Sequence, residues 1–290
     1  MTVALPDSVT LCLGIGAQKA GTTWLATYFD AHPSVFMSPI KELHYFDALW
    51  DPDRMGKRNE QHLNRLKHIA GNLTIDDVVG GSERWNELGD ELDRLAMVGG
   101  GHAKYLEFFA KRVGDRPVAA EITPHYALLD ADNYREIRSL HPRVKVVFLM
   151  RNPVDRVWSA VRHLERNGLD VETKFDKAIQ WSGMRDRTDY GRTLQVLDAV
   201  FPDGTAFVEF YEGLFTEASI RRLCDFLEIP YHPAPFDTVV NRAKERAMTK
   251  EQRRRVGEML RPVYQYCHER FGDRLPERWQ ADLNAISQGT

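Results

Sequence analysis

The most constraining feature of this chain is an apolar strand followed at once by a glycine-bounded loop and a helix. Residues 9–15 (VTLCLGI) form a nearly continuous apolar run, as expected of a strand covered on both faces of a parallel sheet. The loop at residues 16–21 leads into a helix that opens at Thr22 and ends before Pro33, because helical backbone is disfavoured before a proline. Such a unit predicts an α/β fold.

The rest of the chain continues the alternation of strands and helices. Further strands are expected at residues 34–37, 118–122, 144–150 and 205–211. Helical patterns lie near residues 103–113, 130–140, 153–167, 189–201 and 216–228. Strands that alternate with helices favour a mostly parallel sheet with helices on both faces. We therefore predict a P-loop-type three-layer α/β fold with a central sheet.

Residues 51–100 do not fit this alternation. They are polar, carry glycine clusters at 80–81 and 99–101, and show weak periodicity. Long segments without clear elements of their own often serve as active-site lids or binding loops. We interpret the whole chain, residues 1–290, as a single domain in which residues 51–100 form a lid or substrate insertion.

Composition excludes several classes of protein. The 39 Lys and Arg against 42 Asp and Glu leave a net charge of −3, which argues against a general nucleic-acid coat. The 3 cysteines are too few and too scattered for a disulfide framework or a zinc site, and Cys12 and Cys224 fit buried thiols. The sequence shows neither a signal-peptide pattern nor an apolar run of about 18 residues. The expected location is the cytoplasm, without a membrane span.

The loop after the first strand has the outer spacing of a nucleotide P-loop. Gly16 and Gly21 match G-x-x-x-x-G-K-[ST], but Thr22 stands where that motif has its lysine, and the only loop lysine is Lys19. A helix N-terminus after such a loop favours an anion. ATP with magnesium is disfavoured because the lysine that reaches its outer phosphates is missing. A plain connection without a ligand stays the alternative for this loop alone.

A second anion pocket is expected after the strand at residues 144–150. Arg151 ends that strand, Asn152 suits an N-cap and Pro153 suits the first helical position. Ser159 falls off the apolar stripe of the helix. Its polar face is shared with Asp155, Arg156 and Arg162. Arg151 with a hydroxyl and a helix N-terminus suits a phosphate. Two such pockets on one sheet edge suggest a nucleotide phosphorylated at two separate places.

These motifs resemble those of the PAPS-dependent sulfotransferases, PAPS being 3′-phosphoadenosine 5′-phosphosulfate. Residues 16–25 resemble the family's 5′-phosphosulfate loop, and residues 151–159 its R-[DN]-P-x-x-R-x-x-S motif. Residues 41–47 (KELHYFD) are similar to the K-E-x-H-[FY]-F segment of the Golgi carbohydrate- and heparan-sulfate-type enzymes and their bacterial relatives. Residues 121–126 resemble G-E-x-[ST]-P-x-Y, and residues 211–227 the Y-E-D-L…L-x-x-F-L stretch. Five segments in the family's order make the resemblance specific.

The resemblance implies a role for each matching residue. Lys19 would contact the 5′-phosphate and the bridging oxygen of the sulfuryl group, and Arg151 with Ser159 would hold the 3′-phosphate. Glu42 would be the general base, with His44 as the rival base. The remaining nucleotide contacts would be Ala20, Gly21, Thr22, Thr23 and Trp24, with Arg242 and Lys244 in a loosely matching C-terminal loop, and His125 would line the substrate site. Ile122 stands where several relatives have a lysine, so that contact to the sulfuryl group is absent.

The implied reaction is transfer of the sulfuryl group from PAPS to a hydroxyl of a small molecule, lipid or carbohydrate, leaving PAP. Sulfuryl transfer is an in-line displacement that requires positioning and charge stabilisation on the leaving oxygen, so no metal is expected. The alternatives are an ATP-dependent small-molecule kinase and a catalytically silent protein that binds PAP or PAPS. The sequence leaves the acceptor, O- versus N-sulfation and the oligomeric state open, and it indicates no nucleic-acid partner.

Overall fold

A five-stranded parallel sheet organises the protein, in the order β2-β3-β1-β4-β5. The computed structural model describes residues 4–168, 170–202, 204–236 and 247–288. The strands are β1 (Thr10–Gly16), β2 (Val35–Met37), β3 (Val118–Ile122), β4 (Val144–Met150) and β5 (Ala206–Phe210). The predicted α/β fold with a central parallel sheet is confirmed, and β3 and β4 have the predicted bounds.

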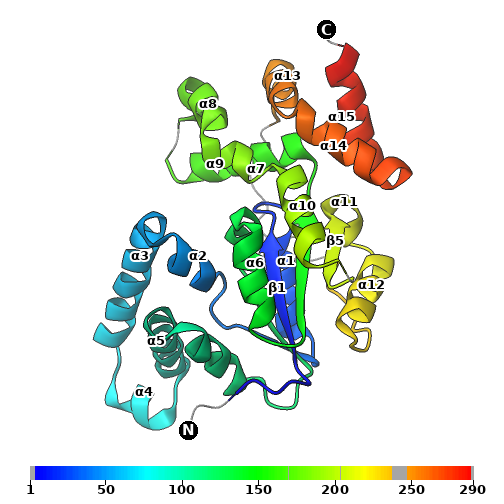
Figure 1. The fold of residues 1–290 in the computed structure, drawn as a ribbon. Helices are drawn as coiled ribbons and strands as arrows, with labels where there is room; N and C mark the ends of the chain where they lie inside the picture. Colours follow the sequence, from blue (N-terminus) through cyan, green and yellow to red (C-terminus); the bar gives the residue numbers. More distant parts are fainter. Residues whose placement is uncertain (1–3, 169, 203, 237–246, 289–290) are drawn as a thin grey trace.

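Helices cover both faces of the sheet, with α6 and α10 in front and α1 behind in Figure 1. The helices that follow or flank the strands are α1 (Thr22–Ala31), α2 (Tyr45–Trp50), α6 (Ala131–Ser139), α7 (Pro153–Arg166), α8 (Val171–Gln180), α9 (Ser182–Asp186), α10 (Tyr190–Val200), α11 (Tyr211–Leu214) and α12 (Glu217–Leu227). The C-terminal helices are α13 (Lys250–Met259), α14 (Arg261–Phe271) and α15 (Glu277–Gln288), with short 3-10 helices η1 (Pro124–Leu128) and η2 (Gly272–Arg274).

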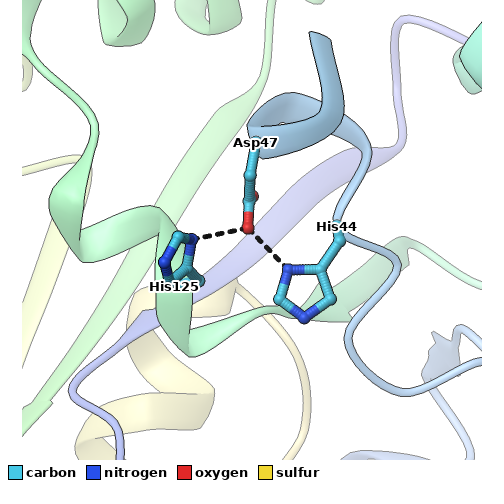
Figure 2. A group of neighbouring side chains, drawn as sticks. All are labelled: His44, Asp47 and His125. Carbon is cyan, nitrogen blue, oxygen red and sulfur yellow. Dashed lines mark hydrogen bonds and ion pairs between the residues drawn. The ribbon is translucent and has the colours of Figure 1, made fainter. Parts of the chain in front are cut away.

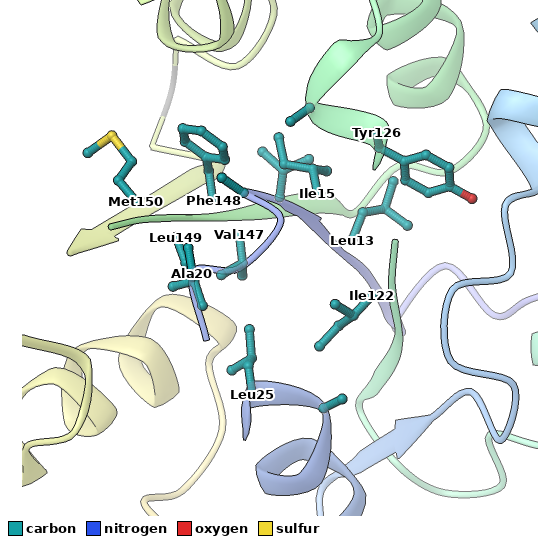
Figure 3. Packing of buried hydrophobic residues seen from close by; sticks show 14 of the residues in the cluster. Leu13, Ile15, Ala20, Leu25, Ile122, Tyr126, Val147, Phe148, Leu149 and Met150 are labelled. Atoms are coloured by element: carbon teal, nitrogen blue, oxygen red, sulfur yellow. The ribbon is translucent and has the colours of Figure 1, made fainter. Parts of the chain in front are cut away.

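The core lies between the sheet and these helices. All seven residues of β1 are buried, as is all of β4 except Lys145, which explains why both strands read as unbroken apolar runs. Figure 3 shows Leu13 and Ile15 on one face of the sheet, towards Tyr126, and Val147 and Leu149 on the other face, towards Leu25 of α1. Cys12, Cys224 and Cys267 are buried free thiols, which confirms the prediction for the first two.

Residues 51–100 are helical rather than unpatterned. They form α3 (Pro52–Gly71), α4 (Ile75–Gly80) and most of α5 (Glu83–Ala110), a group to one side of the sheet in Figure 1. The helix predicted near 103–113 is the C-terminal part of α5, beyond a kink at Gly101. The end of α5 enters the core through Phe108 and Phe109. Within the described residues, no helix combines the length and the apolar character required to cross a bilayer.

Candidate active site

The glycine loop connects the end of β1 to α1 through left-handed backbone. Lys19 (φ 72°) and Gly21 (φ 93°) both have positive φ, a conformation that glycine adopts freely and lysine only with strain. Gly21 is the N-cap of α1, and a Cβ there would lie 3.1 Å from side-chain atoms of Leu214 and Tyr211. Because no side chain caps α1, its first N–H groups stay available to an anion.

A cleft of about 650 Å³ opens over this loop. It brings together most of the residues predicted for the site: Lys19, Gly21, Thr22, Thr23, Trp24, Glu42, Arg151 and Ser159. Ala20, within the loop, is fully buried. His44 and His125 lie behind the cleft wall rather than on it. Arg162 lines the cleft with Ser159, as their shared helix face predicted, whereas the cleft residues Lys41, His163 and Arg166 were given no role from the sequence. Arg242 and Lys244 fall outside the described residues.

Arg151 joins the end of β4 to the glycine loop. Its Nη1 donates to the Lys19 carbonyl over 3.2 Å, and its guanidinium lies 4.5 Å from the centre of the Tyr211 ring. Tyr190 donates to the Arg151 carbonyl over 2.8 Å. Ser159 lies on α7, further along the same cleft. The guanidinium and the hydroxyl can therefore face one ligand from two sides.

Arg156 does not lie on the cleft face, contrary to the prediction that it shares the face of Ser159. It is fully buried, and it donates to the Thr188 hydroxyl over 2.9 Å and to the Met184 carbonyl over 2.8 Å. Arg156 does lie on a side of α7 away from its apolar stripe, as the helical spacing predicted, but α9 and the following turn cover that side. Arg156 therefore links α7 to α9 through these hydrogen bonds.

Trp24 is mostly a core residue, with one edge at the cleft. It is only 4% exposed and stacks on Tyr28 at 5.9 Å and on Phe236 at 6.2 Å between ring centres. Its indole N–H donates to the Pro235 carbonyl over 3.4 Å. The tryptophan therefore fixes α1 against the segment around residue 235 while closing one side of the cleft.

The Lys19 ammonium lies in an environment that disfavours its charge. Burial is the main cause that lowers the pKa of Lys19, and the cationic groups of Arg166, Arg151 and Lys41 lower it further, whereas Glu42 opposes them. No ion pair among the described residues involves Lys19. A group of cations without enough carboxylates is stabilised when an anionic ligand enters.

Glu42 and His44 belong to a tight segment between β2 and α2. Both have left-handed backbone, with φ of 61° and 53°, and such conformations persist only where neighbouring contacts enforce them. The Glu42 N–H donates to the Ile122 carbonyl over 3.1 Å. The Glu42 side chain is 30% exposed on the cleft, whereas that of His44 is 1% exposed behind it.

A buried carboxylate, Asp47, links two histidines. Its Oδ2 lies 2.5 Å from His44 Nδ1 and 2.7 Å from His125 Nδ1 (Figure 2). Burial opposes ionisation of Asp47, but hydrogen bonds from His125 and His44 prevail and hold its pKa at about 2. An ionised carboxylate only accepts, so both Nδ1 atoms carry a proton. The other His44 nitrogen, Nε2, then lies 3.3 Å from Glu42 Oε2.

Asp47 was not assigned from the sequence. The available signal was its position three residues after His44 at the start of a helix, where a short side chain can reach back. Its contact with His125 joins segments 78 residues apart in the chain, which no local pattern reveals.

The same three residues are the one group among the described residues that could hold a metal ion, with ligand atoms within 4.8 Å of one another. Ligands around a tetrahedral zinc ion at about 2.1 Å lie roughly 3.4 Å apart. The 2.5 and 2.7 Å contacts to Asp47 fit hydrogen bonds better.

Beneath this group lies a second buried carboxyl, Glu121 of β3. It accepts from Tyr105 over 2.6 Å, from Thr123 over 2.9 Å and from Tyr126 over 3.2 Å. The Tyr126 oxygen in turn accepts the N–H of Tyr45 over 3.0 Å, at the start of α2. Glu121 therefore supports the segment that carries Glu42 and His44. Burial raises its pKa to about 7, although the hydroxyl donors lower it.

Replacing Glu121 by glutamine is expected to change how stability depends on pH. The folded protein holds the Glu121 proton more tightly than the unfolded chain, so its stability falls as pH rises from about 4.5 to about 7. The raised pKa corresponds to about 3 kcal/mol over that window. Urea unfolding at several pH values should show this fall in the unaltered protein and not in Glu121→Gln. Parallel pH profiles for the two proteins would contradict it.

Comparison with known proteins places the chain in a family. Residues 13–233 match the model of the sulfotransferase family, and no curated protein matches the chain in sequence.

A sulfotransferase structure from Alicyclobacillus acidocaldarius is similar at 20% identity, covering 93% of this chain and 98% of that one with a TM-score of 0.63. The sulfotransferase domain from the curacin biosynthetic pathway is 18% identical over 78% of this chain and 75% of its own, with a TM-score of 0.47. A sulfotransferase from Mycobacterium avium is 13% identical over 94% of this chain and 78% of its own, with a TM-score of 0.48. The match over residues 13–233 covers more than half of the chain, which belongs to the sulfotransferase family.

Proposed function

We propose that this sulfotransferase transfers the sulfuryl group of PAPS to a hydroxyl of a small molecule, lipid or carbohydrate. The observation that carries the proposal is the single cleft lined by Lys19, Glu42, Arg151 and Ser159. A cation for the leaving oxygen, an anion pocket for a second phosphate and a carboxylate for the acceptor proton thus border one space. Displacement at sulfur needs these three elements in fixed positions.

The donor would lie along the cleft with its two ends on different motifs. The glycine loop and the N-terminus of α1, from Gly21 to Thr23 with Lys19 beside them, would hold the 5′-phosphosulfate. Arg151 and Ser159 would hold the 3′-phosphate. Trp24 presents only an edge to the cleft and would border the nucleotide rather than stack broadly on it.

Transfer would proceed in one step. The acceptor oxygen forms a bond to sulfur while the bond from sulfur to the phosphate oxygen breaks, and PAP leaves with the bonding electrons. Glu42 takes the acceptor proton, and Lys19 stabilises the negative charge that grows on the leaving oxygen. The leaving phosphate is already a stable anion, so the step requires no metal.

The contacts around His44 favour Glu42 over His44 as the base. Glu42 reaches the cleft, whereas His44 is buried behind it with Nδ1 held by Asp47. His44 Nε2 faces Glu42 Oε2, so the ring, when Nε2 carries a proton as well as Nδ1, would donate to the carboxylate and orient it. His125 is bonded to Asp47 and does not line the cleft, so we assign it to support of this group rather than to the acceptor.

The donor is identified by a thermal-shift experiment with PAP, with ADP, and with ATP plus magnesium. PAP at 100 times its dissociation constant should stabilise the fold by about 2.7 kcal/mol. Stabilisation by PAP alone supports the proposal. Stabilisation by ATP with magnesium and not by PAP would favour a kinase. Binding of PAP without sulfate transfer from labelled PAPS to any alcohol, phenol or sugar in a panel would favour a silent nucleotide-binding protein.

Removal of divalent metals is expected to leave both binding and turnover unchanged. Lys19 and the helix N-terminus supply the positive charge that a kinase draws from magnesium. The PAP-induced shift and the rate of sulfate transfer are measured in EDTA and after addition of magnesium or zinc. Activity that disappears in EDTA and returns with zinc would mean that His44, Asp47 and His125 hold a required ion.

A further inference from the structure

The segment that carries Glu42 and His44 is fixed by a buried arginine from the helical insertion. Arg94 of α5 is 1% exposed, and its Nε donates to the Leu43 carbonyl over 3.1 Å. Leu43 lies between the two left-handed residues, Glu42 and His44. A hydrogen bond at that carbonyl restrains the peptide units on both sides of it.

Two further side chains of α5 reach the same place. His102 Nδ1 lies 2.9 Å from the hydroxyl of Tyr45, the residue that follows His44 in the chain. Tyr105 stacks on the Tyr45 ring at 4.6 Å between centres and donates to Glu121 over 2.6 Å. These contacts come from beyond the kink at Gly101 and Arg94 from before it, so both parts of α5 hold the start of α2.

Burying a guanidinium is costly unless it has a role or strong partners. Arg94 lies near the charges of Glu91 and Asp47, and Asp47 is the carboxylate that orders the two histidines. The arginine therefore acts on this segment through its bond to the Leu43 carbonyl, and the nearby Asp47 carboxylate favours the arginine's charge. An apolar residue would fill the same volume at lower cost but would leave that carbonyl without its donor.

We propose that Arg94 is a positioning residue, which holds the Leu43 carbonyl so that His44 stays bonded to Asp47 and Glu42 points into the cleft. This proposal rests on the proposed function for the role of Glu42, but its geometry can be tested without an acceptor. It also gives the helical insertion a second role, because α5 supports the catalytic segment whether or not residues 51–100 cover the acceptor.

The test compares Arg94→Met, which removes the donor and the charge, with Arg94→Lys, which restores both in part. The matched control is Arg65→Met, because Arg65 of α3 also lies against Glu91, at 3.5 Å, while its other ion pair is with Glu87 of the same helical insertion. The first readout is the far-downfield proton resonance of the short His44 Nδ1–Asp47 bond, assigned by its loss in His44→Asn. We expect it to be lost in Arg94→Met, regained in part in Arg94→Lys and unchanged in Arg65→Met.

The second readout separates positioning from general damage. With PAPS and a fixed acceptor from the panel, we expect kcat of Arg94→Met to fall by about 10²-fold, as expected of a small misplacement of a reacting group, with the PAP-induced thermal shift unchanged. An unchanged His44 resonance in a folded Arg94→Met, or an equal loss in Arg65→Met, would overturn the proposal. If Arg94→Met does not fold, slow exchange of the Arg94 Nε–H in the unaltered protein is the deciding measurement, and rapid exchange overturns it.

Failure of the proposed function gives a different result. A protein that neither binds PAP nor transfers sulfate, but still loses the His44 resonance in Arg94→Met, would retain the positioning role and lose the assigned chemistry. If the protein transfers sulfate but the Arg94 substitutions change neither the His44 resonance nor kcat, the proposed chemistry stands and the positioning role is wrong.

Discussion

Replacing Glu42 by glutamine is expected to lower kcat for sulfuryl transfer by about 10²–10⁴-fold, the usual contribution of a positioned base. Glutamine keeps the shape of the side chain but cannot take the acceptor proton. The affinity for PAP should not fall, because Glu42 is the carboxylate next to the Lys19 ammonium and its removal makes the cleft more positive. Steady-state transfer from labelled PAPS at saturating substrate measures kcat, and the PAP-induced thermal shift measures binding.

The controls separate the base from its neighbour. Glu60→Gln removes an exposed carboxylate of α3 and should behave as the unaltered protein does. His44→Asn should also slow transfer, since it removes the imidazole that lies 3.3 Å from Glu42, but by less than Glu42→Gln. A Glu42→Gln variant with full turnover, beside an inactive His44→Asn, would transfer the role of base to His44.

Local patterns were sufficient where the structure depends on local causes. The bounds of β3 and β4 followed from their unbroken apolar runs, because both strands are buried on both faces. The glycine loop could be placed because Gly21 occupies a left-handed N-cap position against Tyr211. The convergence of the motifs on one cleft followed from the topology, since the carboxyl ends of parallel strands share one edge of the sheet.

Features that depend on distant contacts could not be predicted in this way. Asp47 and Arg94 look like ordinary polar helix residues in the sequence, although Asp47 contacts His125, 78 residues away, and Arg94 contacts Leu43, 51 residues away. Arg156 shows the opposite error, because its helical position suggested the cleft while α9 buries it. Residues 51–100 show weak periodicity because few of their buried positions are apolar: α4 buries no residue, and α5 before its kink buries Glu91 and Arg94 beside Met97.

Replacing Lys19 by alanine is expected to produce the other large loss, about 10²–10³-fold in kcat, the usual effect of deleting one group that stabilises a developing oxyanion. The proposed leaving oxygen of PAP would then lose its nearest cation in a site that, by this mechanism, has no metal to replace it. Transfer is measured at saturating PAPS, and Lys67→Ala on α3 is the matched control for loss of an exposed lysine.

The stability of the Lys19→Ala variant distinguishes a chemical role from a structural one. Alanine and lysine are strained alike by the left-handed backbone at this position, so the loop should keep its shape. Removal of a half-buried ammonium that repels Arg166, Arg151 and Lys41 should leave the unliganded protein at least as stable as before. The stabilisation by PAP should shrink, because the cleft has lost one charge of a phosphate site.

A variant that is less stable without ligand, yet transfers sulfate at the normal rate, would show that Lys19 shapes the loop and that another cation serves the leaving oxygen. Lys41, whose Nζ already reaches the Thr23 hydroxyl at 2.8 Å, would then be the first residue to replace.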